Sequence, residues 1–344
     1  YFLFLLNNSS DLERVRPFIF SVICVFIFIA AIPSIYQKYS REVILNELTN
    51  ASFLVLIMFI LNSVASTIYK FSPMEMYGIK SGILFGNLWA AAFNTLPMAL
   101  FLVLLKGVSE KKFLYILVSV VSVFFIMLTL RRTVMGLSAF GAVVCLLTLM
   151  TQQKAKMLFP IVAMIVVTGY IIYNNTDFLQ EFKDRVELRK LDDRELAEEK
   201  RFIEYSLLYD DMFVYKAYSP WFGYELFNSA GNYGKGFLAE RSLHGDIPNI
   251  LHSSGLIGVT LYLLMIGTAF WQSIRSAKKY HDKLIVLFCT VTFLVYTVTG
   301  RYTEGAATLF LFLVLMLPLA ESEESCPALS EQASGFQQLQ PKVE

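Results

Sequence analysis

The sequence predicts an all-α, polytopic membrane protein, and its composition and its long apolar runs carry this prediction. Of the 344 residues, 56% are hydrophobic and 17% are charged, with a net charge of +1, and the mean hydropathy is +0.55. Soluble proteins carry about 25% charged residues, so this chain is poor in charge. The composition excludes a disordered chain, a collagen-like fibre and a nucleic-acid-binding domain, which needs a basic excess.

Nine apolar segments approach the roughly 20 residues that a helix needs to cross the hydrocarbon of a bilayer. In chain order they are residues 17–36, 52–69, 85–105, 113–130, 133–150, 157–173, 250–271, 284–299 and 306–320. Residues 1–6 are apolar, lack a methionine and resemble the end of another span. We therefore expect one or more further helices before residue 1.

Basic residues in the short loops predict the orientation, because such loops face the cytoplasm. Among the short loops, those after the first, third, fifth and seventh segments carry most of the Lys and Arg: Lys38, Arg41, Lys106, Lys111, Lys112, Lys154, Lys156, Arg275, Lys278, Lys279 and Lys283. This orientation divides the chain into N-terminal transmembrane helices (1–173), one large extracytoplasmic loop (174–249), C-terminal transmembrane helices (250–320) and a disordered cytoplasmic tail (321–344). Within the loop, residues 177–204 are dense in charge and predict solvated helix.

Arginines at two outer turns depart from this charge distribution and predict an anion site. Arg131 and Arg132 stand together at one turn, and Arg301 stands at another. A guanidinium binds phosphate through a planar fork, and each charge pair at about 4 Å contributes roughly 4 kcal/mol at a dielectric near 20. Arg201 and Arg241 of the outer loop are further candidates for the same lipid-diphosphate site. The alternative is that these side chains anchor helix ends at lipid phosphates.

The most informative segment is the one in which the outer loop enters the seventh span. His244 and Asp246 lie two residues apart, so either side chain can orient the other or accept a proton. Gly255 and Gly258 allow a close helix contact. His252, two helical turns beyond His244, is interpreted as structural.

Other polar and aromatic residues of the loop leave alternatives open. Asp210 and Asp211 invite a metal site, but adjacent acids are common, and 4 cysteines and 3 histidines supply little material for zinc or for a disulfide framework. We therefore predict neither metal nor cofactor. The aromatic residues can stack on sugar rings, form an interfacial belt or pack the loop itself: Tyr205, Tyr209, Phe213, Tyr215, Tyr218, Trp221 and Tyr224.

The spacing of His244, Gly255 and Gly258 resembles the His…Gly-x-x-Gly signature of bacterial O-antigen ligases and polysaccharide polymerases. The His-Gly-Asp run at 244–246 is similar to a His-x-Asp variant of the polymerase-like members, although Gly245 stands where Asn or Ser often follows the histidine.

Upstream, the Pro-Trp-Phe-Gly-Tyr run at 220–224 resembles the family's Pro-x-x-Gly-x-Gly stretch, with Glu225 in place of the second glycine. Taken residue by residue, the resemblance assigns the family's roles to Arg131 or Arg132, to Arg201 and to His244.

The resemblance implies metal-independent glycosyl transfer at the outer, periplasmic face of the bacterial inner membrane. The donor is a glycan on undecaprenyl diphosphate, and the acceptor is a sugar hydroxyl on another lipid-linked glycan (polymerase) or on the lipid A core (ligase). Arginines stabilise the diphosphate leaving group, and His244, with an ordinary pKa of about 6.5, accepts the acceptor's proton with Asp246 as its orienter or substitute. Direct displacement inverts the anomeric centre.

The His-x-Asp form favours the polymerase over the ligase, with a chain-length regulator as a candidate partner. A lipid-linked oligosaccharide flippase and a structural or sensory membrane protein remain alternatives. Against the flippase, the apolar segments carry almost no charge at mid-depth, where transporters place ionisable residues.

Overall fold

The computed structural model describes residues 12–69, 90–128, 131–151, 200–238, 242–299 and 305–320. These residues form helices and connecting loops, and their β-structure is limited to an isolated bridge between Ser219 and Gly223. The predicted all-α class is therefore confirmed for this part of the chain.

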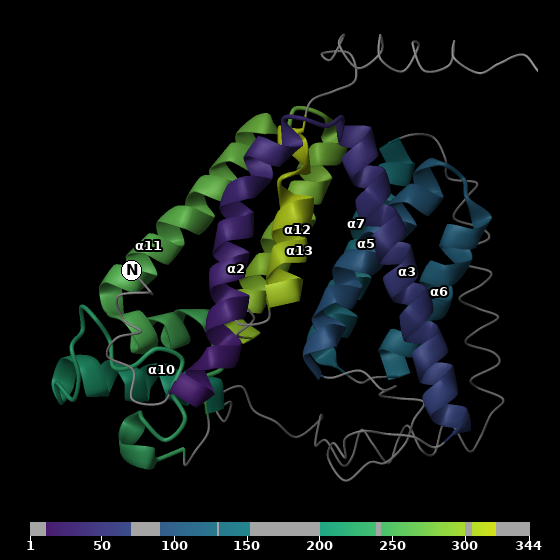
Figure 1. The fold of residues 1–344 in the computed structure, drawn as a ribbon. Coiled ribbons are helices and arrows are strands. Elements are labelled where there is room, and N and C mark those ends of the chain that lie inside the picture. The colour runs from purple at the N-terminus through teal and green to yellow at the C-terminus, as the bar shows by residue number, and fades with distance from the viewer. Residues whose placement is uncertain are drawn as a thin grey trace, which may run out of the picture.

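Long apolar helices make up most of the described structure (Figure 1). Their bounds are α2 Leu12–Tyr36, α3 Arg41–Ile68, α5 Leu96–Ser109, α6 Phe113–Leu128, α7 Arg132–Thr151, α11 Asp246–Ser276, α12 Tyr280–Thr299 and α13 Gly305–Leu315. Shorter elements are η1 Ala90–Thr95, α10 Lys200–Tyr209, the π-helical turn η4 Asp210–Val214, η5 Gly234–Gly236 and η6 Leu317–Leu319.

Three of the described helices are long and apolar enough to cross a membrane, at Arg41–Ala65, Asp246–Ser276 and Tyr280–Thr299. Five others, in α2, α5, α6, α7 and α13, are apolar over 10–17 residues. Each predicted span overlaps one of these helices, except residues 157–173, which lie outside the described residues. The transmembrane character thus has support, whereas the total of nine spans and the division into four regions stay predictions.

The starts of several helices differ from the predicted spans because hydropathy locates only the apolar part of a helix. The α3 helix begins at Arg41 rather than at residue 52. Its first turn is polar, and the Val43 N–H donates to Ser40 Oγ over 3.4 Å. The α5 helix begins at Leu96 rather than at residue 85, because a 3-10 turn precedes it and Pro97 opens its first turn.

The α5 helix is the centre of one half of the bundle. All its residues from Leu96 to Val108 are buried, and it packs against α3, α6 and α7. A helix that is apolar on every side needs such an all-round cover. Its one buried cation, Lys106, donates to Asn46 Oδ1 over 2.8 Å and lies 5.6 Å from the Tyr115 ring centroid, so the charge is partnered.

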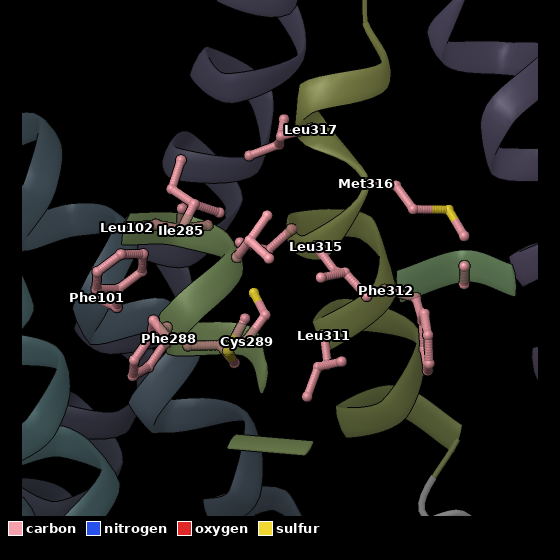
Figure 2. Close-up of a cluster of buried hydrophobic side chains, with 14 of the residues drawn as sticks. Phe101, Leu102, Ile285, Phe288, Cys289, Leu311, Phe312, Leu315, Met316 and Leu317 are labelled. Carbon is pink, nitrogen blue, oxygen red and sulfur yellow. The ribbon is translucent and has the colours of Figure 1, made fainter. Parts of the chain in front are cut away.

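The α12 helix is the centre of the other half. It packs against α7, α11 and α13, and α13 packs in turn against α2. Figure 2 shows Phe288 of α12 facing Phe101 of α5 within this core. Their rings stack at a centroid distance of 4.1 Å. The absence of a side chain at Gly141 leaves room for this contact, since a Cβ there would lie 3.1 Å from the Phe288 ring.

Three of the basic loops meet at one end of the bundle. Arg41, after the α2–α3 loop, forms an ion pair with Asp282 at the start of α12. Lys106, near the end of α5, contacts Asn46 near the start of α3. The loops that join α2 to α3, α5 to α6 and α11 to α12 therefore share one end, as the predicted orientation requires.

We expect Asp282→Asn to lower the free energy of unfolding by about 3 kcal/mol, because it leaves the Arg41 charge without its partner in a buried position. The two side chains are only 15% and 7% exposed. The control is Glu110→Gln, which breaks the exposed Lys112–Glu110 pair (48% and 42% exposed) and costs less than about 1 kcal/mol. Thermal melting in detergent measures both variants, and equal melting temperatures would contradict the assignment.

Candidate functional site

The α11 helix is broken at Gly255. This residue has φ +64° and ψ −167°, a conformation open to glycine alone. A Cβ on Gly255 would also overlap the backbone of Trp221 and Phe222. A break of this kind leaves carbonyls of the preceding turn and N–H groups of the following turn without helical partners.

The loop formed by residues 219–224 supplies the missing partners. The Leu256 N–H donates to the Pro220 carbonyl over 2.8 Å, and the Tyr224 N–H donates to the His252 carbonyl over 2.7 Å. The loop approaches this closely because Gly223, at φ +78°, has no Cβ, and a Cβ there would lie 2.5 Å from the His252 oxygen. The glycine-containing runs at 220–224 and 255–258 are therefore bound to each other.

Aromatic side chains surround His252 just before the break. Its ring is fully buried, with the Tyr218 and Tyr224 rings at centroid distances of 5.4 and 5.5 Å. Its Nε2 lies 3.2 Å from the Asn232 carbonyl. Burial raises the pKa of Tyr218, with a smaller effect of Asp211 in the same direction. These contacts agree with the structural interpretation of His252.

A buried carboxylate holds His244 at the entrance to α11. Glu204 Oε2 accepts the backbone N–H of His244 over 2.9 Å, and Oε1 lies 3.1 Å from the ring Nδ1. The His244 side chain is 40% exposed, whereas the Glu204 side chain is 0% exposed. An Nδ1–H that donates to this carboxylate leaves Nε2 of the neutral ring as a proton acceptor.

Glu204 is the site residue that the sequence did not reveal. It belongs to the charge-dense residues 177–204, for which we predict solvated helix, and the structure buries it completely. Its place on α10 is fixed by an apolar cluster in which Leu208 packs with Met212, Tyr233 and Leu243. The remainder of that segment, residues 177–199, lies outside the described residues.

The backbone just before His244 is held by two hydrogen bonds of Leu243. The Leu243 N–H donates to Ser229 Oγ over 3.1 Å, and the Asn249 side chain donates to the Leu243 carbonyl over 3.1 Å. His244 therefore has a fixed main chain and an oriented ring, which is the arrangement that proton transfer requires.

Asp246 lies beside this pair as the first residue of α11. It is 2% exposed, and a carboxylate at a helix N-terminus is stabilised by the helix dipole. Burial raises the pKa of the Tyr205 hydroxyl, and the carboxylates of Asp246 and Glu204 shift it further in the same direction. The Tyr205 hydroxyl thus interacts electrostatically with the carboxylates of Asp246 and Glu204, beside the turn formed by residues 244–246.

Of the arginines predicted to bind an anion, the structure describes the side chains of the two at the start of α7. The Arg131 guanidinium lies 4.6 Å from the centroid of the Phe93 ring, and Arg132 is exposed at the first position of α7. The Tyr296 hydroxyl donates to the Asn94 carbonyl, which joins this region to the end of α12.

The α11 and α12 helices pack against each other and are joined by a short turn, so they are antiparallel. The last residues of α12 therefore lie at the end of the bundle at which α11 begins. Arg131 and His244 therefore lie at the same end of the bundle, opposite the basic loops. In Figure 1, α10 lies at that end, below α11. Arg201 lies on α10, one turn before Glu204, with only its backbone described. Arg241 and Arg301 lie outside the described residues.

The two acids Asp210 and Asp211 begin the π-helical turn. The Asp211 carboxylate is buried and accepts the Gly234 N–H over 2.5 Å. Within the described ranges, no group of three or more His, Cys, Asp and Glu is placed to hold a metal ion. Asp211 thus has a structural role in closing the loop.

The fold and this site together define a class: a helical protein of transmembrane character that carries an oriented histidine at one end of its bundle. No protein-family model matches the chain, and no curated protein matches it. The family resemblance of its motifs therefore remains an expectation.

We expect Gly255→Ala to lower the melting temperature and the yield of folded protein, because alanine in this glycine-only region of φ and ψ is strained by about 1–3 kcal/mol and its Cβ overlaps the Trp221 backbone. The control is Gly267→Ala in the same helix, where nothing lies within 4 Å of a new Cβ, so that stability is retained or rises by up to about 1 kcal/mol. Fluorescence-detected gel filtration after heating measures both, and an unchanged Gly255→Ala protein would contradict the described break.

Proposed function

We propose that this protein is a polymerase that joins oligosaccharide repeat units, carried on undecaprenyl diphosphate, into a surface polysaccharide such as an O-antigen or an exopolysaccharide. The reaction is metal-independent, inverting glycosyl transfer at the periplasmic face of the bacterial inner membrane. The observation that carries the proposal is the contact between the half-exposed His244 ring and the buried Glu204 carboxylate. The resemblance at residues 220–258 supports it.

His244 is the general base in this proposal. The acceptor sugar hydroxyl gives its proton to Nε2 of His244 while its oxygen attacks the anomeric carbon of the donor. The anomeric C–O bond breaks, and its electron pair leaves with the lipid diphosphate. Glu204 keeps the ring in the tautomer that accepts this proton and stabilises the imidazolium that forms, the role that a buried carboxylate has in a catalytic triad.

The arginines serve the leaving group. Negative charge develops on the diphosphate as the bond breaks, and guanidinium groups can stabilise it in place of a metal ion. Arg132 is exposed at the end of the bundle that carries His244, and Arg131, Arg201, Arg241 and Arg301 are further candidates for this diphosphate site. Asp246 is the alternative base if His244 does not transfer the proton.

The ligase alternative uses the same chemistry with the lipid A core as acceptor, so the product distinguishes the two enzymes. A flippase would relocate the lipid-linked glycan without forming a glycosidic bond. Transporters need ionisable groups at the membrane midplane, whereas Glu204, His244 and Asp246 gather at one end of the bundle. An oriented base at that end favours an enzyme over a flippase.

We expect His244→Ala to reduce elongation of a purified lipid-linked oligosaccharide by about 10²–10⁴-fold, because the general base is lost. Glu204→Gln should cost at least about tenfold, since the neutral amide no longer stabilises the imidazolium. The control is His281→Ala, the same substitution at the opposite end of α12, which should keep full activity. Gel analysis of the glycan measures the product.

One outcome would reassign the catalytic base, and two others would contradict the polymerase. Full polymer from His244→Ala together with its loss in Asp246→Ala would reverse the assignment of the base. Transfer of the glycan to added lipid A core without elongation would identify a ligase. Absence of any new glycosidic bond, with movement of the lipid-linked glycan across vesicles, would identify a flippase.

We expect Arg132→Ala to weaken the binding of undecaprenyl diphosphate by about tenfold, because a charge-assisted hydrogen bond contributes roughly 1.5–3 kcal/mol. The control is Arg275→Ala, an exposed arginine in the last turn of α11 at the other end of the bundle. Titration of the detergent-solubilised protein with the lipid, at two salt concentrations, measures the affinity. Equal affinities of the two variants would remove Arg132 from the diphosphate site.

A further inference from the structure

The Tyr205 hydroxyl lies directly against Gly245. A Cβ built on Gly245 would lie 2.9 Å from the Tyr205 hydroxyl oxygen and 2.9 Å from Pro248 Cδ. The backbone of Gly245, at φ −80° and ψ 148°, is one that any residue adopts. Position 245 therefore needs glycine for space and not for conformation, and part of that space is taken by the hydroxyl of Tyr205.

Tyr205 and Glu204 are consecutive residues of α10 and act on consecutive residues of the next segment. Glu204 holds His244, and Tyr205 lies against Gly245. Tyr205 is 40% exposed, the same fraction as the side chain of His244. Among the residues that the structure describes, its hydroxyl has no hydrogen-bond partner, so it is available to a ligand.

The chemistry of this hydroxyl selects the kind of ligand. Burial raises the pKa of Tyr205, and the carboxylates of Asp246 and Glu204 raise it further, so the hydroxyl stays protonated and can donate as well as accept a hydrogen bond. A neutral sugar, with hydroxyls for the donor and an apolar face for the ring, fits the position.

We propose that Tyr205 and Gly245 form a saccharide subsite, in which the Tyr205 hydroxyl binds the acceptor sugar beside His244. This subsite rests on the proposed glycosyl transfer and adds to it the residue that binds the acceptor. Glycine at position 245, where the family that the motif resembles often has Asn or Ser, then leaves the space in which the Tyr205 hydroxyl lies.

The first experiment compares Tyr205→Phe with Tyr209→Phe, an exposed tyrosine one turn further along α10. The acceptor is a soluble repeat-unit oligosaccharide, titrated at a saturating concentration of lipid-linked donor. Loss of one neutral hydrogen bond raises KM for the acceptor about three- to tenfold in Tyr205→Phe. Since chemistry is unaffected, kcat stays within about twofold and its pH profile is unchanged. Tyr209→Phe behaves as the wild type.

The second experiment tests the contact itself. Gly245→Ala displaces the Tyr205 hydroxyl and should raise the same KM. In the double variant with Tyr205→Phe, the two effects combine to less than their product, because both changes remove one contact. Fully multiplicative effects would place the hydroxyl elsewhere and overturn the subsite. Melting temperatures of all variants separate this result from a loss of folding.

A binding measurement separates the failure of the subsite from the failure of the proposed function. Saturation-transfer NMR of the soluble oligosaccharide with the detergent-solubilised protein requires no donor. The wild type should bind, with weaker binding by Tyr205→Phe. Equal binding and equal KM in Tyr205→Phe, while His244→Ala abolishes elongation, would overturn the subsite alone. Absence of elongation by the wild type would overturn the proposed function, and absence of binding would overturn the subsite as well.

Discussion

The break of α11 at Gly255 is the constraint on which the end of the bundle that carries His244 depends. Backbone groups released by a helix break need partners, most of all near a bilayer that offers no water, and the loop at 219–224 provides them through Pro220 and Tyr224. The bound loop also places Tyr218 and Tyr224 on the ring of His252. The first segment of α11, residues 246–254, is thereby fixed, and with it the turn that carries His244.

The second constraint is electrostatic. A carboxylate removed from water is costly unless its oxygens accept hydrogen bonds, and Glu204 directs both oxygens to His244. The burial of Glu204 and the orientation of His244 are therefore one requirement. A ring held only by packing can rotate, whereas a ring held by a charged acceptor has a defined tautomer.

The helices could be predicted from the sequence because apolar length is a local property. The predicted segments 113–130 and 284–299 overlap α6 (Phe113–Leu128) and α12 (Tyr280–Thr299), and α12 begins earlier because its first turn is polar. His244 could be singled out because its neighbours in sequence are distinctive. Glu204 could not, because its partner lies 40 residues further along the chain, and its charged surroundings are those of a solvated helix. Only the packing of Leu208 and Leu243 distinguishes it.

The glycines at 245 and 255 show why a motif has to be interpreted with its neighbours. Gly255 is required by its own backbone, since positive φ and the adjoining loop both exclude a side chain. Gly245 has an ordinary backbone, and only Tyr205 and Pro248 exclude a side chain there. Gly255 is thus required by its own backbone conformation, whereas Gly245 is required by the side chains of Tyr205 and Pro248 that pack against it. The α10 helix therefore accounts for part of the need for glycine at position 245, because it carries Tyr205 beside the glutamate that orients His244.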